Sequence, residues 1–194
     1  MKSGIKILFT LAVIAAITVF AVQKYTKTAL YNEFEAYPER YSDIVEKYSR
    51  QYGVETAIIY ATILCESGFD EKAVSSAGAQ GLMQITPETF EWLCTKTGDN
   101  AEEIDIFDAD TNIRYGTLLL SMLYEEYGDA TVAHAAYNAG RGRIREWMKN
   151  EAYYKDGKLY NIPFRETRNY VTKIKNATDK YRNISEVQNE RAYF

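Results

Sequence analysis

One helix predicted from this sequence is expected to be buried on all sides. Residues 55–65, ETAIIYATILC, are apolar on nearly every face, whereas a surface helix carries its apolar residues along one stripe. Gly68 follows shortly afterwards and supplies a stop signal. Such a helix needs other elements packed around it from every direction. We therefore expect this segment to form the centre of a domain.

Glu66 closes the buried helix. Burial disfavours a carboxylate, and so does the partial negative charge at a helix C-terminus, so both effects predict a raised pKa. A carboxylic acid that keeps its proton near neutral pH can serve as a general acid for a leaving group. The alternative is a glutamate that ends the helix, faces water and has no chemical role.

The remaining patterns are also helical. Thr86 and Pro87 look like an N-cap followed by proline at the first helical position, and Gly98 ends that helix. Asp156-Gly157 between short flanks predicts a small hairpin. Further helices are predicted after Pro38 up to Gly53, from a cap at Asp108, Asp110 or Asn112 to Gly128, from Asp129 to Gly140, over residues 144–150, and from Phe164 to Tyr181. Without βαβ alternation, internal repeats or heptads, the predicted fold class is all-α with one small hairpin.

The N-terminus resembles an export signal. A basic stretch at residues 1–6 precedes an uninterrupted apolar run of 16 residues at 7–22, which as a helix would span about 24 Å, less than the ~30 Å core of a bilayer. The site after Ala21 is a poor cleavage site, which favours an uncleaved anchor over a cleaved signal peptide. Either way the domain lies outside the cytoplasm. The expected segments are a signal-anchor or signal peptide (1–24), a linker (25–38), a catalytic domain (39–182) and a polar tail that frays (183–194).

Composition narrows the possible partners. Lys and Arg total 23 against 27 Asp and Glu, for a net charge of -4, and no long basic run occurs beyond the N-terminus, so nucleic acid is excluded as a partner. Seventeen tyrosines and two tryptophans suit sugar binding, although most are expected in the core. Cys65 and Cys94 could form a disulfide in an exported protein or remain two buried thiols.

Several common catalytic chemistries are excluded by the residues present. His134 is the only histidine, which rules out a His-pair zinc site, and no G-x-S-x-G elbow accompanies it for a serine hydrolase. Its alanine neighbours predict a packed residue. The aspartates at 105–110 lack the glycine and final glutamate of a calcium loop. A carboxyl-based mechanism remains, and its commonest use is glycoside cleavage.

Ordinary glycosidases need a second carboxyl group, and none stands out near Glu66. Asp70 lies beyond Gly68 and is expected to face the surface. Glu88 and Glu91 fall in the first turn of the next helix, where interaction with the helix dipole explains them.

Five sequence strings together resemble the soluble lytic transglycosylase family, the lysozyme-like enzymes that cut peptidoglycan. They are Glu66-Ser67, then residues 78–87 (GAQGLMQITP), Asn112-Ile113 with Gly116, residues 136–140 (AYNAG), and Ile162-Pro163 with Glu166-Thr167 and Tyr170-Val171. Each string alone is weak, but their order and spacing match the family over residues 40–181. The resemblance implies a lysozyme-like helical bundle.

The resemblance also implies a reaction. Glu66 would protonate the glycosidic oxygen between N-acetylmuramic acid and N-acetylglucosamine. As a carboxylate, it would then take a proton from the muramyl C6 hydroxyl while that oxygen closes onto C1, leaving a 1,6-anhydromuramyl end. The substrate supplies the nucleophile, which accounts for the missing second carboxylate. The implied partner is the glycan strand of peptidoglycan, and no metal or organic cofactor is implied.

Matching positions imply further substrate contacts. Ser75 would lie near the muramyl N-acetyl group, Gln84 would bind sugar, Tyr137 would approach Glu66 and the reacting ring, and Glu166 would help to hold the muramyl side. Thr86 replaces a methionine that lines the cleft in some members. Two other functions stay open: a lysozyme-type hydrolase on the same fold, and a non-catalytic wall-binding or assembly protein. The sequence does not identify any partner in a larger envelope complex.

Overall fold

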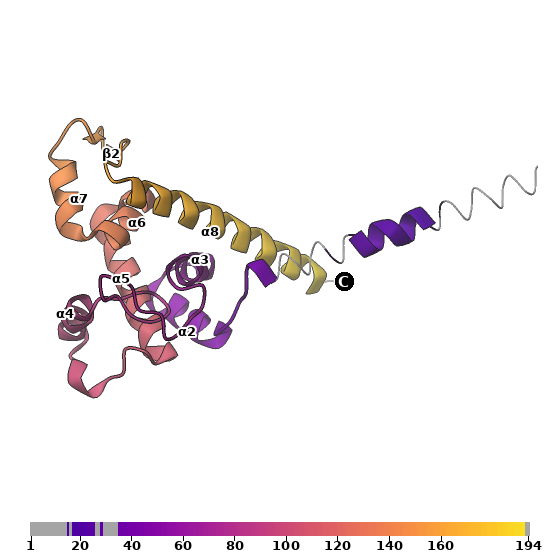
Figure 1. The fold of residues 1–194 in the computed structure, drawn as a ribbon, viewed down its shortest axis with the longest axis horizontal. Coiled ribbons are helices and arrows are strands. Elements are labelled where there is room, and N and C mark those ends of the chain that lie inside the picture. Colours follow the sequence, from indigo (N-terminus) through magenta and orange to yellow (C-terminus); the bar gives the residue numbers. More distant parts are fainter. Residues whose placement is uncertain (1–14, 16, 26–27, 29–34, 193–194) are drawn as a thin grey trace, which may run out of the picture. The chain divides into compact units, whose positions relative to one another are not determined.

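The computed structural model describes residues 15, 17–25, 28 and 35–192 (Figure 1). It divides the chain into two units, residues 1–38 and 39–194. In the first unit residues 17–25 are helical, and their apolar side chains, such as Phe20, are exposed. None of the described helices is long and apolar enough to cross a membrane. The apolar run predicted at 7–22 and the linker at 25–38 both lie partly outside the described residues.

The second unit is helical with one hairpin, which confirms the predicted fold class. Its elements are α2 (Ser42–Tyr52), α3 (Thr56–Glu66), α4 (Pro87–Thr97), the short 3-10 helix η1 (Ala101–Glu103), α5 (Ala109–Tyr127), α6 (Ala130–Ala139), α7 (Arg141–Met148), β1 (Tyr154–Lys155), β2 (Lys158–Leu159) and α8 (Arg165–Ala192). The two strands pair in antiparallel fashion, with Tyr154 opposite Leu159.

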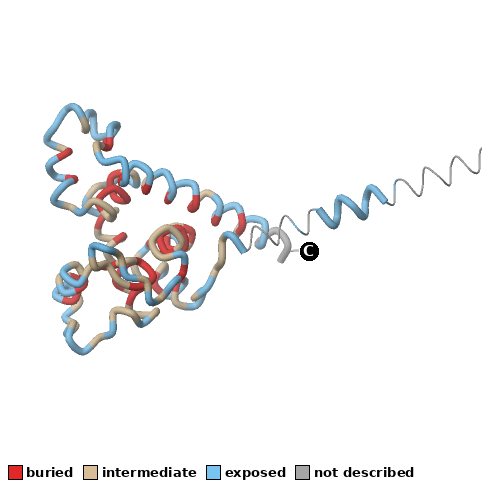
Figure 2. The backbone as a smooth tube through the Cα atoms, viewed as in Figure 1, coloured by how far each residue is buried: buried red, intermediate tan, exposed pale blue. Residues whose placement is uncertain are grey.

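Helix α3 forms the centre of this unit, as its composition predicts. Six of its eleven residues are buried, and the helix packs along α8 and against α2. Tyr60 of α3 stacks on Tyr181 of α8 with ring centroids 5.2 Å apart. Figure 2 shows buried residues recurring along α8, and the apolar ones are Tyr170, Ile174, Ala177, Tyr181 and Ile184. Their spacing of three or four residues turns one stripe of the long helix towards the core.

Helix α8 extends further than its sequence pattern suggested. It continues to Ala192, whereas the prediction placed its end at Tyr181 and expected frayed residues from 183 onwards. The reason is visible at Ile184, which is 6% exposed and continues the buried stripe by one more turn. The predicted end was therefore too early.

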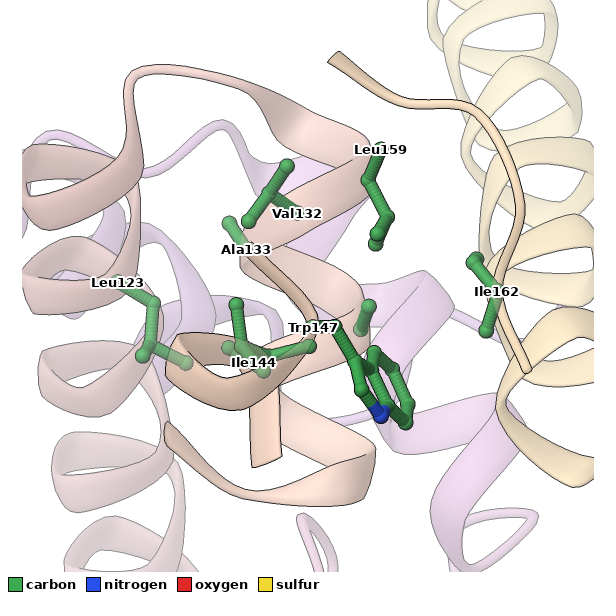
Figure 3. Packing of buried hydrophobic residues seen from close by; sticks show 9 residues of the cluster. Leu123, Val132, Ala133, Ile144, Trp147, Leu159 and Ile162 are labelled. Atoms are coloured by element: carbon green, nitrogen blue, oxygen red, sulfur yellow. The ribbon is translucent and has the colours of Figure 1, made fainter. Parts of the chain in front are cut away.

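A second group of buried residues joins the later elements (Figure 3). It contains Leu123, Val132, Ala133, Ile144, Trp147, Leu159 and Ile162, from α5, α6, α7, β2 and the segment before α8. Trp147 also meets Phe164 edge to face at 5.3 Å. This packing fixes the small hairpin and the start of α8 to the helical body.

The predicted helix caps are largely confirmed. Thr86 and Asp129 each accept a hydrogen bond from the backbone three residues on, at 3.3 and 3.0 Å. Of the three candidates before α5, Asp108 is the cap. Asp156 and Gly157 both have positive φ, at 52° and 77°, as a tight two-residue hairpin turn requires. Cys65 and Cys94 are free thiols, so the disulfide alternative is not realised.

Candidate active site

Glu66 is the last residue of α3, and its neighbour Ser67 fastens that helix end to a loop. The Ser67 hydroxyl lies 2.8 Å from the Leu82 carbonyl and 3.2 Å from the Ile63 carbonyl, and it accepts a hydrogen bond from the Phe69 amide at 3.1 Å. Position 67 therefore has a structural use beside the acid. It holds residues 81–84 against the end of α3.

The environment of Glu66 raises its pKa to about 7, as predicted from burial. Desolvation is the largest cause, because the charged carboxylate loses water that the protein does not replace. The Tyr170 hydroxyl opposes this effect by interacting with the carboxylate form, while the negative charge of Glu166 raises the pKa further. Glu66 can therefore hold or release a proton near neutral pH.

Two tyrosines accompany the acid. Tyr137 of α6 donates a hydrogen bond to the Met83 carbonyl at 2.8 Å, so it also supports the loop. Tyr170 of α8 is 8% exposed, and its buried hydroxyl has no hydrogen bond of good geometry among the described residues. Burial, followed by the charge of Glu66, raises the pKa of both hydroxyls well above the usual value, so both stay neutral.

The loop between α3 and α4 is held by a buried asparagine. Asn112 of α5 accepts a hydrogen bond from the Met83 amide at 2.7 Å and donates to the carbonyls of Gln80 and Ile106 at 3.0 and 2.8 Å. The side chain is fully buried. The sequence alone suggests Asn112 as a possible helix cap, whereas its side chain ties the loop to α5.

Two glycines of the sequence strings make this close approach possible. A Cβ atom on Gly81, whose φ is +75°, would lie 2.2 Å from the Asn112 Nδ2 atom. A Cβ atom on Gly116 would lie 2.4 Å from the Met83 sulfur. Both positions therefore exclude a side chain.

The predicted sugar contacts Ser75 and Gln84 lie on this same loop. Gln84 has a φ of 50°, and its side-chain nitrogen donates to the carbonyls of Ala73 and Gly81 at 3.1 and 2.9 Å. The Ser75 hydroxyl accepts from the Ala79 amide at 3.0 Å. Among the described residues neither side chain bonds to Glu66. Both first serve to shape the loop, and the Gln84 side-chain oxygen has no hydrogen bond within the described part of the chain.

The residues that the sequence excluded from catalysis lie where they were expected. His134 is 7% exposed and lies 2.7 Å from the Tyr124 hydroxyl, and its burial lowers its pKa to about 4, against an opposing effect of Asp129. It is a packed neutral residue, as predicted. Asp70 is exposed and bonds the Lys72 amide, and Glu88 and Glu91 are exposed on α4.

The structure therefore brings three groups to Glu66. Of these, the resemblance implied Tyr137 beside Glu66, whereas it implied only a contact with the muramyl side for Glu166. Tyr170 was not expected there, although it stands in one of the matching strings, because its apolar-stripe position in α8 is fully explained by packing. Only the approach of its hydroxyl to Glu66 separates it from the other buried tyrosines.

These features can be compared with known proteins. The family model "Transglycosylase SLT domain" matches residues 43–160, and the chain belongs to this family. The fold is that of a known member: the 70 kDa soluble lytic transglycosylase Slt70 from Escherichia coli superposes with a TM-score of 0.70 at 32% identity, covering 79% of this chain and 26% of that one.

Two curated relatives are similar along most of this chain. The soluble lytic murein transglycosylase of Salmonella typhimurium is 35% identical over 145 residues, which are 72% of this chain and 22% of the relative. The membrane-bound lytic murein transglycosylase C of Glaesserella parasuis is 29% identical over 177 residues, which are 79% of this chain and 49% of the relative. The chain thus spans between a fifth and a half of these relatives.

Removing the charge of Glu66 should stabilise the protein at alkaline pH. With a folded pKa of about 7 against an ordinary value of 4.5, ionisation of Glu66 costs folding free energy as the pH rises from 4.5 through 7. We expect Glu66→Gln to raise the free energy of unfolding at pH 8 by about 3 kcal/mol and to change it little at pH 4. Urea denaturation at both pH values measures this, with Glu91→Gln as the exposed control. A Glu66→Gln effect equal at the two pH values would contradict the raised pKa.

Removing the Asn112 side chain, which anchors the loop, should lower the free energy of unfolding more than removing a helix cap. We expect Asn112→Ala to lower the free energy of unfolding by about 3 kcal/mol, because it leaves buried backbone groups without partners. The matched control on the same helix is Asp108→Ala, which removes one exposed capping bond and should cost about 1 kcal/mol. Equal losses in urea denaturation would mean that Asn112 does not anchor the loop.

Proposed function

We propose that this protein is a peptidoglycan lytic transglycosylase. It cleaves the β-1,4 bond between N-acetylmuramic acid and N-acetylglucosamine without water and leaves 1,6-anhydromuramyl ends. Family membership supports the reaction class, and the names of the two curated relatives specify murein as the material on which those proteins act.

The observation that supports this proposal most strongly is the raised pKa of Glu66. The mechanism asks one residue to act first as an acid and then as a base, so both protonation states must be accessible. A pKa of about 7 meets that requirement. A solvated glutamate would already be ionised at neutral pH and could not donate the first proton.

The chemical steps balance on this single group. The Glu66 carboxylic acid gives its proton to the glycosidic oxygen as the bond from that oxygen to muramyl C1 breaks. The C6 hydroxyl oxygen then bonds to C1, and its proton returns to the Glu66 carboxylate. The acid is regenerated, and no water is consumed. The positive charge that develops on the sugar is stabilised by the nearby carboxylate and hydroxyl dipoles.

The residues around Glu66 adjust its pKa, support the loop and bind the substrate. Burial keeps the proton on Glu66 at neutral pH and makes its carboxylate a stronger base for the second step, whereas Tyr170 stabilises the carboxylate and so eases the proton donation of the first step. Tyr137 approaches the reacting ring while supporting the loop. Ser75, Gln84 and Glu166 bind the substrate, with Gln84 using its free side-chain oxygen.

A second function has one observation in its favour. Glu166 is exposed, yet its charge raises the pKa of Glu66, so a second carboxylate does act on the acid. A lysozyme-type hydrolase needs such a group as nucleophile or as the base for a water molecule. The two functions differ in their products, since hydrolysis leaves a reducing muramic acid end.

The location follows from the N-terminus as a proposal. We place the domain outside the cytoplasm in the cell envelope, with residues 7–22 as its membrane anchor or, if cleaved, as its signal peptide. The basic residues Lys2 and Lys6 favour a cytoplasmic N-terminus. The relatives include proteins named soluble and membrane-bound, so the family accommodates either form.

The products identify the reaction. Incubation of purified peptidoglycan with the full chain should release fragments with anhydromuramyl ends, lighter by one water than hydrolytic fragments, and Glu66→Gln should release none because it has no proton to donate. Mass spectrometry distinguishes the two kinds of end. Reducing ends from the wild type would instead establish the hydrolase, and a lack of products from either form would favour a binding protein.

The alkaline limb of the pH profile should shift in opposite directions in two variants. The value of kcat/KM is expected to fall above about pH 7, where Glu66 ionises. Tyr170→Phe removes a group that lowers the pKa of Glu66 and should move this limb to higher pH. Glu166→Gln removes a charge that raises it and should move the limb to lower pH. Initial rates across pH 5–9 measure the limb, and shifts in the same direction would refute this assignment.

A further inference from the structure

A pocket of about 260 Å³ adjoins the candidate active site and has no role in the mechanism above. Its lining comes from α4 (Glu88, Thr89, Trp92), α5 (Leu119, Leu123), α6 (Ala136, Tyr137) and the start of α7 (Gly140, Arg141). Tyr137 belongs to both places, because its hydroxyl also lies in the field of Glu66. A group bound in this pocket would therefore lie next to the reacting sugar.

Arg141 is held in place at this pocket. Its Nη2 atom pairs with Glu126 at 2.6 Å, and its guanidinium lies over the Trp92 ring, 5.0 Å from the centroid. The side chain is 33% exposed, and its Nε atom is buried with no hydrogen-bond partner among the described residues. A fixed guanidinium loses little entropy on binding and offers donors to a carboxylate or carbonyl oxygen.

Glu88 lines the same pocket with the opposite charge. Within the described part of the chain, no cation lies within the 4.0 Å of an ion pair from its carboxylate, and Arg141 pairs only with Glu126. The dipole of α4 stabilises Glu88 in the first helical turn without a side-chain partner. The pocket thus separates an acceptor from a donor, and Leu119, Leu123 and Ala136 supply apolar surface between them.

The charge pattern of the chain agrees with this arrangement. Residues 39–140 contain 18 acidic and six basic residues, whereas residues 141–168 contain four acidic and eight basic residues. Glu88 belongs to the acidic stretch, and Arg141 begins the basic one. A ligand between them should carry both a donor and an acceptor.

We propose that this pocket binds part of the peptide stem carried by the muramic acid residues. Oxygens of the peptide, from a carboxylate or a backbone carbonyl, accept from Arg141, its N–H or amine groups donate to Glu88, and small apolar side chains cover the leucines. A sugar ring fits less well, because stacking needs a free aromatic face. The Trp92 ring has the Arg141 guanidinium at 5.0 Å and the Lys96 ammonium at 5.5 Å. The proposal rests on the proposed function.

Substrates with and without peptides test this assignment. We expect Arg141→Gln in the full chain to raise KM for intact peptidoglycan strands about tenfold, the effect of one charge-assisted hydrogen bond, with kcat unchanged. On strands stripped of peptides by an amidase the variant should match the wild type. The matched control is Arg145→Gln, which also loses a bond to Glu126, at 3.1 Å, but lies outside the pocket. Its KM should not change on either substrate.

Binding without turnover tests the pocket independently of the reaction. In the Glu66→Gln background, peptide stems freed by the amidase should change the fluorescence of Trp92, since the other tryptophan, Trp147, is only 6% exposed. The apparent Kd should rise about tenfold in Arg141→Gln and in Glu88→Gln. It should stay unchanged in the controls Arg145→Gln and Glu91→Gln. Thermal unfolding of each variant confirms that it is folded.

The outcomes separate the two proposals. If the wild type makes no anhydromuramyl ends but binds peptide stems through Arg141 and Glu88, the pocket assignment stands and the proposed function fails. If the wild type is active but peptide stems leave Trp92 unchanged, the pocket assignment is overturned. It is also overturned if Arg141→Gln raises KM equally on stripped and intact strands, or if Arg145→Gln raises KM on intact strands as much as Arg141→Gln does.

Discussion

The packing of α3 along α8 places the acid and the groups that act on it in one position. Because α3 is buried over most of its length, its last residue emerges where the core ends, and Glu66 therefore carries its carboxyl group only partly into solvent. The same contact brings Tyr170 of α8 to Glu66, and Glu166 lies one turn earlier in α8. A change in the register of these two helices would alter both the burial of the acid and its neighbours.

Several residues of the characteristic strings hold the loop beside the acid. Asn112, Gly81 and Gly116 determine how closely α5 approaches the backbone around Met83, and Ser67 and Tyr137 bond to carbonyls of the same segment. The loop contains no helix or strand and only two isolated β-bridges, which pair Gln80 with Val74 and with Ile85, so the side-chain hydrogen bonds add to a sparse backbone pairing. A substrate-binding surface built in this way is rigid before the substrate arrives, which reduces the entropy lost on binding.

Local rules were enough for the elements but not for the contacts between them. The buried α3, the caps at Thr86 and Asp129 and the Asp156-Gly157 turn each follow from a few adjacent residues. Asn112 could not be assigned in this way, because a cap and a buried tether use the same side chain, and only the position of residues 80–83 decides between them. Tyr170 is similar, since its spacing predicts a core position and gives no information about where its hydroxyl lies.

The pKa of Glu66 is a balance, and this balance is what a two-step role for one residue requires. Burial alone would hold the proton so tightly that Glu66 would be a weak acid, whereas full hydration would release the proton and leave no acid at neutral pH. Tyr170 moves the pKa down and Glu166 moves it up, so two residues from one helix adjust the same group in opposite directions. Because both side chains project from α8, their positions relative to Glu66 depend on the α3–α8 contact that also forms the core. Stability and acid strength are therefore set by the same packing, and a mutation that shifts α8 should affect both together.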